Sequence, residues 1–252
     1  MTASGFDTAT LDALLAAPVA VFAWCNRAGE PRSCAVTPYV VDGHAVVTST
    51  LALPTKAAAT RRDPRVALLA GGYLVQATAH VGVDRTSNWF DRNLRVQELQ
   101  KYPAGRALLA IPGHRRLVPW YVGRVVITLA DADTSPAVGP DHTTVTVVVD
   151  GRLRIAPIPD VDPATRAVSV PPELEGPADL LVHEESDDFA ELRQLHRRGT
   201  AANGTLTVDA TTGSLEPGAT GSLAQLCQLR ELARSARRHR AELAAWPPPA
   251  VG

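Results

Sequence analysis

The sequence is poor in cysteine, methionine and aromatic residues. Its 252 residues include three cysteines, one methionine and 5% aromatic residues. Cys25, Cys34 and Cys227 form no C-x-x-C pair, which excludes a disulfide framework and a zinc cluster built from cysteines alone. We therefore expect reduced thiols, the usual state of cysteines in the cytoplasm.

Long apolar runs are also missing. The longest covers residues 14–25 and is interrupted by Pro18, whereas a membrane-spanning helix needs about 20 apolar residues. The N-terminal residues show no basic segment followed by an apolar one, which a secretion signal would require. We therefore expect a cytoplasmic protein without a membrane span.

Neither sign of charge is in excess. The 25 Lys and Arg residues stand against 26 Asp and Glu residues, so the formal net charge is -1 at pH 7. This balance argues against a nucleic-acid-binding protein. A basic helix face is expected near the C-terminus, and we expect it to be solvated because no aromatic residues alternate with its arginines. Its members are Arg230, Arg234, Arg237, Arg238 and Arg240.

The common catalytic motifs are absent too. The sequence contains no G-x-S-x-G, H-E-x-x-H, G-x-x-x-x-G-K-[ST] or G-x-G-x-x-G pattern. Its seven histidines have no ligand-like spacing, so we expect no metal site. The catalytic residues therefore stay unknown at this point.

Residues 1–130 predict a barrel made of strands and short helices. A helix is expected over 8–17, ending before Pro18. The apolar period then changes to two, which indicates antiparallel strands joined by turns. The expected strands cover residues 19–25, 32–41, 44–50, 65–70, 73–84 and 116–130, with a short helix near 54–62.

A further helix is predicted over residues 87–101, with Ser87 as its N-cap. Its inner face would carry Phe90, Leu94 and Leu99. With the strands, this helix predicts a mainly β domain with α, a β-barrel plus helices in the crossovers.

A linker is predicted over residues 131–142, which are rich in Asp, Pro, Ser and Gly, and a second half over 143–252. Strands are expected over 143–149, 152–159, 164–170, 177–185 and 204–209, with a helix over 188–198. This order resembles that of residues 19–84 and suggests an internal repeat; the alternative is an unrelated β-rich domain. A long C-terminal helix over 222–246 is expected to end in a frayed PPPAVG tail.

The most informative polar pattern lies within residues 46–72. Hydroxyl groups end a predicted strand, and a lysine lies at the start of the next short helix. Hydroxyls, a lysine and free helix N-terminal amides are groups that bind phosphate, although a solvated amphipathic helix would show the same residues. The candidates are Thr48, Ser49, Thr50, Thr55 and Lys56, with Arg61 or Arg62 as a helper.

The order of these motifs resembles the flavin-binding split-barrel superfamily, which includes the pyridoxamine 5'-phosphate oxidase-like proteins and their deazaflavin-dependent relatives. The matching features are the G-x-P turn at 29–31, Thr50, Lys56 and the R-x-D-P-R-V-A-L run at 61–68. The resemblance covers about residues 11–129, and the rest only through the suspected repeat. It implies an FMN-binding split barrel, here a tandem of two barrel-like halves that ends in the long helix.

The resemblance also implies a cofactor and its site. FMN is expected, with the deazaflavin coenzyme F-420 and then haem as alternatives. Thr48, Ser49, Thr50, Thr55 and Lys56 would bind the phosphate, with Arg61 as a helper. The ring would lie in a groove between two barrels, where Trp120 could stack on it; the alternative is a core position for Trp120 on a barrel strand.

Two features depart from the family pattern. LALP at 51–54 replaces a more polar loop, and Thr55 stands where a basic residue is common. PPELEG at 171–176 stands where the first half has TKAAATRR, so at most one of two grooves would keep the phosphate site. The family normally forms its site across a homodimer, and here the partner would be a second chain or the second half of this one, in a pseudo-dimer.

The function implied is a flavin- or deazaflavin-dependent oxidoreductase that transfers a hydride to or from a small conjugated molecule. In such a site the cofactor supplies the chemistry, and the protein supplies orientation and electrostatics. Two alternatives stay open. One is a non-catalytic carrier or sensor that binds flavin or haem, and the other is an interaction protein without a cofactor.

Overall fold

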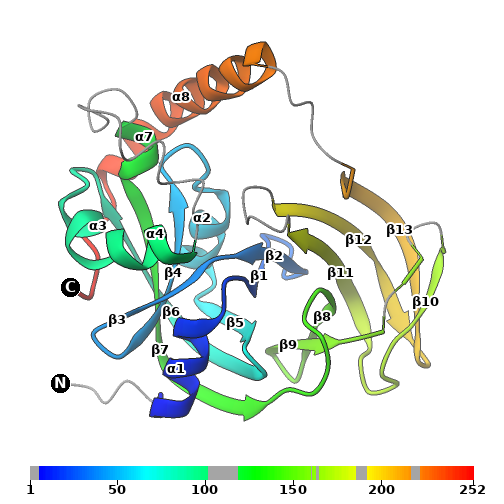
Figure 1. Ribbon diagram of the computed structural model, residues 1–252. Coiled ribbons are helices and arrows are strands. Elements are labelled where there is room, and N and C mark those ends of the chain that lie inside the picture. The colour runs from blue at the N-terminus through cyan, green and yellow to red at the C-terminus, as the bar shows by residue number, and fades with distance from the viewer. Residues whose placement is uncertain (1–5, 102–118, 160, 163–164, 186–191, 217–221) are drawn as a thin grey trace.

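The computed structural model describes residues 6–101, 119–159, 161–162, 165–185, 192–216 and 222–252 (Figure 1). The protein is mainly β, with two curled sheets, short helices on the first sheet and a long C-terminal helix. The expected fold class, a mainly β tandem of barrel-like halves, is therefore confirmed. Within the described residues, none of the helices combines the length and the apolar character needed to cross a bilayer.

The first sheet contains seven strands, and its short helices lie in the connections. The strands are β1 (Ala20–Cys25), β2 (Pro31–Val36), β3 (Pro38–Val41), β4 (His44–Thr50), β5 (Arg65–Ala70), β6 (Tyr73–Asp84) and β7 (Arg124–Pro136). The helices are α1 (Thr8–Ala16), α2 (Thr55–Arg62), α3 (Asn88–Asn93), α4 (Arg95–Lys101) and α7 (Pro119–Val122).

The strand order of this sheet explains its curvature. The order is β2-β1-β5-β6-β7-β4-β3, so β2 and β3 lie at opposite edges although only Thr37 separates them in the chain. The sheet must therefore curl until its two edges meet, which produces a barrel-like shape. Its interior is filled by fully buried apolar side chains, among them Phe22, Leu68 and Ile127.

The second sheet repeats this order without an equivalent of β3. Its strands are β8 (Thr143–Val149), β9 (Arg152–Pro157), β10 (Ala167–Ser169), β11 (Gly176–Glu185), β12 (Leu192–Ala202) and β13 (Thr205–Ser214). Their order is β9-β8-β11-β12-β13-β10. With β8 to β13 in the places of β1, β2, β4, β5, β6 and β7, this matches the order of the first sheet. A separate apolar cluster that includes Val145, Leu180 and Leu206 forms its core.

The two sheets pack through equivalent strands. β2 contacts β8, β11 and β12 of the second sheet, while its equivalent, β9, contacts β1, β5 and β6 of the first. Each contact thus has a counterpart when the two halves are exchanged, as in an isologous dimer interface. A buried apolar cluster that includes Val21, Leu69, Ile155 and Leu181 fills the space between them.

The C-terminal helix α8 (Ser222–Ala244) returns the chain to the first sheet, where the C-terminus lies beside α3 (Figure 1). The Arg85 guanidinium donates to the carbonyls of Leu243, Ala244 and Trp246. The backbone N–H of Val83 donates to the Pro247 carbonyl at 2.8 Å. The expected fraying of the PPPAVG tail is therefore wrong, because β6 and the start of the next connection bind this segment.

Three predicted elements differ in the structure. The predicted helix over 188–198 is strand β12 from Leu192 onward, with the earlier residues outside the described part. The predicted strand over 116–130 begins only at Arg124, because Pro119–Val122 forms α7, and residues 116–118 are not described. Strand β7 also runs on to Pro136, through the first part of the predicted linker.

Two smaller differences concern local geometry. The predicted strand over 32–41 is interrupted at Thr37, which allows β2 and β3 to occupy opposite edges. The predicted helix over 87–101 is two helices, and Ser87 does not cap the first with its side chain. Ser87 has φ = 62°, and its hydroxyl donates to the Thr86 carbonyl instead. Phe90 and Leu94 are buried as expected, and Leu99 is half-buried against them.

Candidate functional site

A cavity of about 270 Å³ lies where the ends of β2 and β4 meet α2, α4 and α7. The chain folds this way because β4 ends at Thr50 and a short turn leads directly into α2. The cavity is lined by Ala35, Val36, Thr37, Tyr39, Thr48, Ser49, Thr50, Leu53, Lys56, Glu98, Tyr121 and Arg124. It therefore joins hydroxyls and a lysine to a group of phenols, a carboxylate and a guanidinium.

The hydroxyls and the lysine are the candidate anion-binding groups of the cavity. Thr48, Ser49 and Thr50 are the last three residues of β4, and Lys56 lies in the first turn of α2. The Thr50 Oγ1 atom is buried without a hydrogen-bond partner among the described residues. The Lys56 ammonium has no hydrogen bond or ion pair to another residue that the structure describes, although the Lys56 carbonyl accepts from the Thr60 hydroxyl. An unpartnered buried hydroxyl and an ammonium group that line the same cavity are suited to a phosphate, which can accept hydrogen bonds from such groups.

The structure brings four of the seven predicted site residues together and leaves three outside the cavity lining. Thr55 is exposed at the start of α2. The Arg61 guanidinium stacks on the Trp246 ring, 4.7 Å from its centre. Trp120 belongs to helix α7 and not to a strand, and its buried ring meets Tyr121 edge-on at 6.1 Å. Cofactor contacts by these three residues stay predictions.

A buried polar network forms the opposite wall of the cavity. The Glu98 carboxylate accepts hydrogen bonds from Arg124 Nη2 at 2.9 Å, from the Tyr121 hydroxyl at 3.2 Å and from the Tyr39 hydroxyl. The Arg124 guanidinium also lies 4.6 Å from the ring centres of both Phe90 and Tyr121. The side chains of Glu98 and Arg124 are only 6% and 4% exposed, so this ion pair is removed from water.

Burial sets the protonation states around this network. It raises the pKa of Tyr39 well above its usual value, with the Glu98 charge adding to the effect, and raises that of Tyr121 for the same reasons. Both phenols are therefore neutral hydrogen-bond donors at physiological pH. The Lys101 ammonium lies beside the Tyr39 ring and donates to the carbonyls of Leu14 and Pro38. Burial lowers the pKa of Lys101 to about 8.

Sequence reasoning missed Tyr39, Glu98, Tyr121 and Arg124. One signal was available, because Phe90, Leu94 and Glu98 recur at helical spacing on one expected face. A carboxylate that continues an apolar face is expected to have a buried partner. The sequence did not show that this partner is Arg124, which lies on β7.

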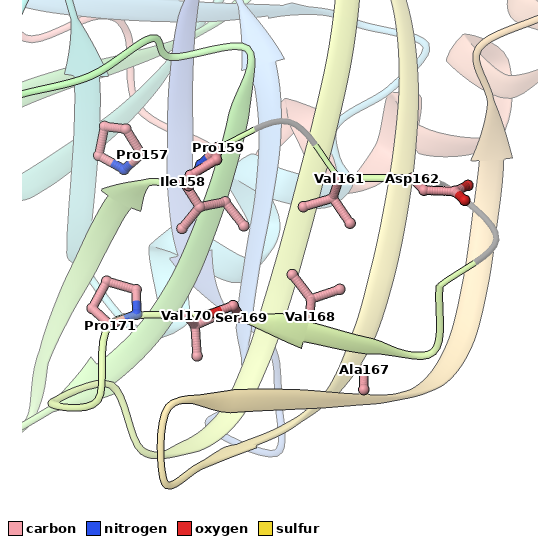
Figure 2. Close-up of a pocket in the computed structure, with 10 residues that line it drawn as sticks. All are labelled: Pro157, Ile158, Pro159, Val161, Asp162, Ala167, Val168, Ser169, Val170 and Pro171. Atoms are coloured by element: carbon pink, nitrogen blue, oxygen red, sulfur yellow. The ribbon is translucent and has the colours of Figure 1, made fainter.

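A larger cavity, of about 480 Å³, lies in the second half between residues 157–162 and the β10 region (Figure 2). It lies at the end of β9 and along β10, the equivalents of β2 and β4. Figure 2 shows Ile158, Val161 and Val168 grouped around this space, with the Asp162 carboxylate directed away from them. Its described lining contains no lysine or arginine. Of these two cavities, only the one in the first half therefore has a lysine or an arginine in its described lining.

Comparison with solved structures finds distant similarities over about half of the chain. A proposed pyridoxamine 5'-phosphate oxidase from Listeria innocua is 18% identical over 51% of this chain and 94% of its own, with a TM-score of 0.37. An FAD-binding protein from Mesorhizobium loti is 18% identical over 51% of this chain and 92% of its own, with a TM-score of 0.33.

An F420 reductase is 15% identical over 49% of this chain and 94% of its own, with a TM-score of 0.34. No protein-family model matches the sequence, and no curated protein does. Split-barrel likeness at this level concerns about half of the chain and assigns no activity to it.

Proposed function

We propose that the protein is a cytoplasmic oxidoreductase of the split-barrel type that binds FMN, or alternatively the deazaflavin coenzyme F-420, by its phosphate. The observation that supports this most directly is that the unpartnered Thr50 hydroxyl and the Lys56 ammonium line the same cavity. The substrate would be a small conjugated molecule that gives or takes a hydride.

The residues present fit the phosphate of such a cofactor. Thr48, Ser49 and Thr50 offer hydroxyl donors, and Lys56 offers a positive charge that no described carboxylate neutralises. When bound, the flavin or deazaflavin ring supplies the hydride chemistry. The chain itself would bind the phosphate, orient the cofactor and limit access of water.

The polar network around Glu98 would provide hydrogen-bond donors beside the bound cofactor. Glu98 accepts from both phenols, so Tyr39 and Tyr121 are held in place as neutral O–H groups beside the cavity. Arg124 pairs with the Glu98 carboxylate, which offsets part of the cost of burying both charges. This arrangement provides fixed dipoles and two proton-bearing groups, the Tyr39 and Tyr121 hydroxyls, in a buried wall of the cavity.

The second half would take the place of the partner subunit. Its strands pack on β2 and β5 in the way that an isologous dimer partner would, so we propose an intramolecular pseudo-dimer in place of a homodimer. The phosphate site would then occur once per chain, because the described lining of the equivalent cavity contains no lysine or arginine.

The test is a titration of the purified protein with FMN and with coenzyme F-420. Lys56→Ala should weaken binding of the preferred cofactor by about 10- to 100-fold, the effect of losing a hydrogen bond to a charged group. The control is Arg27→Ala, an exposed turn residue of the same charge, which should leave binding unchanged.

Three results would change the proposal. Unchanged affinity in Lys56→Ala would remove the phosphate assignment. A bound flavin that no substrate reduces or reoxidises would favour the carrier or sensor. A protein that takes up neither cofactor would favour an interaction protein.

A further inference from the structure

Strand β2 is an edge strand whose outward backbone groups meet side chains of the second half. The Asp179 carboxylate on β11 accepts from the Ser33 backbone N–H at 2.7 Å. The Gln194 amide on β12 accepts from the Ala35 N–H at 2.9 Å and lies 3.4 Å from the Ala35 carbonyl, to which its Nε2 donates. These side chains replace the neighbouring strand that an edge otherwise lacks.

The backbone held by Gln194 forms the rim of the anion-binding cavity. Ala35 lines that cavity together with the next two residues, Val36 and Thr37, and Lys56 is part of the same lining. Thr37 is also the point where the chain crosses from one edge of the sheet to the other. A loss of the Gln194 contacts would therefore free a segment that shapes the cavity.

We propose that Gln194 is a positioning residue for cofactor binding, through which the second half of the chain completes the site in the first half. The inference rests on the proposed function for its ligand. Gln194 does not line the cavity itself. It acts through the Ala35 backbone, whose position it fixes by two hydrogen bonds with one planar amide.

The chain offers a matched control on the other side of the interface. Gln76 on β6 donates from Nε2 to the Leu153 carbonyl on β9 at 2.6 Å. β6 and β9 are the equivalents of β12 and β2, so Gln76 forms the same kind of contact between equivalent strands. It lies away from the described lining of the anion-binding cavity. Gln76 therefore shares the structural role of Gln194 without its proposed effect on the cofactor.

The experiment compares Gln194→Met with Gln76→Met in the full-length protein, since methionine keeps the length of the side chain and removes its hydrogen bonds. FMN affinity should fall by about fivefold to tenfold in Gln194→Met and stay unchanged in Gln76→Met. Both variants should lose similar thermal stability. Equal FMN affinity in the two variants would overturn the proposal, because it would reduce Gln194 to an ordinary interface contact.

Hydrogen exchange separates this inference from the proposed function. In the absence of any cofactor, exchange of the peptide covering residues 31–37 should accelerate in Gln194→Met and not in Gln76→Met. If exchange accelerates in this way but the wild type does not bind FMN, the proposed cofactor is wrong, while Gln194 still fixes the rim of the cavity. Unchanged exchange in both variants would overturn the positioning role. Where Gln194→Met fails to fold, Gln194→Asn keeps the amide but is one methylene too short to hold both Ala35 backbone groups, and it should accelerate exchange of the same peptide; unchanged exchange there would also overturn the role.

Discussion

The carboxylate of Asp179 accepts hydrogen bonds from both the backbone N–H and the hydroxyl of Ser33, at 2.7 and 2.8 Å. Asp179 is fully buried, and His196 and Arg198 lie within 3.7 and 3.5 Å of it. The two residues are 146 positions apart and belong to different sheets. A buried carboxylate needs such partners to offset its desolvation, so this contact fixes how the two halves meet.

Asp179→Asn should therefore destabilise the protein markedly. The amide can replace only part of the acceptor capacity of the carboxylate and leaves buried donors without their charged partner. We expect the free energy of unfolding to fall by about 2–3 kcal/mol, measured by urea denaturation. The control is Asp133→Asn, whose ion pair with Arg152 is exposed and should be worth less than about 0.5 kcal/mol. Similar losses in the two variants would contradict the role given to Asp179.

Glu98→Gln should also destabilise the protein, for a different reason. The change leaves the guanidinium of Arg124 buried without a negative partner. Breaking one side of a buried pair costs about 3 kcal/mol or more. Glu30→Gln provides the comparison, since the Glu30 pair with Arg32 is partly exposed and is expected to contribute little. A Glu98→Gln protein as stable as Glu30→Gln in the same denaturation experiment would argue against the buried pair.

The sequence predicts most of the first half because its patterns are local. The alternation of apolar residues, the turns and Pro18 define α1 and β1 without reference to distant parts. The predicted helix over 188–198 fails for a physical reason. Leu195 and Arg197 are buried on one face of β12, while Gln194 contacts β2 on the other. The buried face of β12 thus carries an arginine among its apolar residues, while the other face is half-buried or exposed, so the apolar alternation that predicts a strand is interrupted.

The candidate site also contains a part that the sequence predicts and a part that it does not. Thr50 and Lys56 are close in sequence, so a strand end followed by a short helix predicts their proximity. The Glu98 network joins α4, β3, α7 and β7, which only the closed sheet brings together. The contact of Gln194 is even less predictable from the sequence, because it depends on the way in which the second half packs on β2.

The buried amine of Lys101 should make stability depend on pH. Its pKa is lowered by burial to about 8, while an unfolded lysine titrates near 10.4. Between these values the unfolded chain binds a proton that the folded chain does not, so this group makes stability rise as pH increases from about 8 to about 10. Urea denaturation across this range should show the gain in the wild type relative to Lys101→Met. A pH-independent difference between the two proteins would contradict the lowered pKa.

The docked C-terminal segment should contribute to stability. Trp246 is 5% exposed, packs in the first core and stacks under Arg61, and the carbonyls around it are bound by Arg85. Trp246→Ala should lower the free energy of unfolding by about 3–5 kcal/mol, as expected for a buried tryptophan. Val138→Ala is the control because Val138 is 92% exposed. Equal stability of the two variants would mean that the tail is not bound in solution.

The pairing of the two halves also predicts the oligomeric state. An exposed edge strand can pair with another chain. An isologous interface joins two equivalent surfaces, and once they are joined neither is free to bind another chain. In this protein the outward groups of β2 are bound by Asp179 and Gln194, and β9 packs on β1, β5 and β6. The surfaces through which equivalent halves meet are therefore already occupied within one chain, and we expect a monomer of 26.7 kDa.

Sedimentation equilibrium at micromolar concentrations measures this mass directly. A monomer in the wild type is the expected result, because a second chain could reach β2 only after the second half had moved away from it. Asp179→Asn weakens that internal contact and should be the variant in which a concentration-dependent dimer first appears. A stable wild-type dimer would contradict the idea that the second half takes the partner's place, because two chains could associate only through a surface that the second half does not cover.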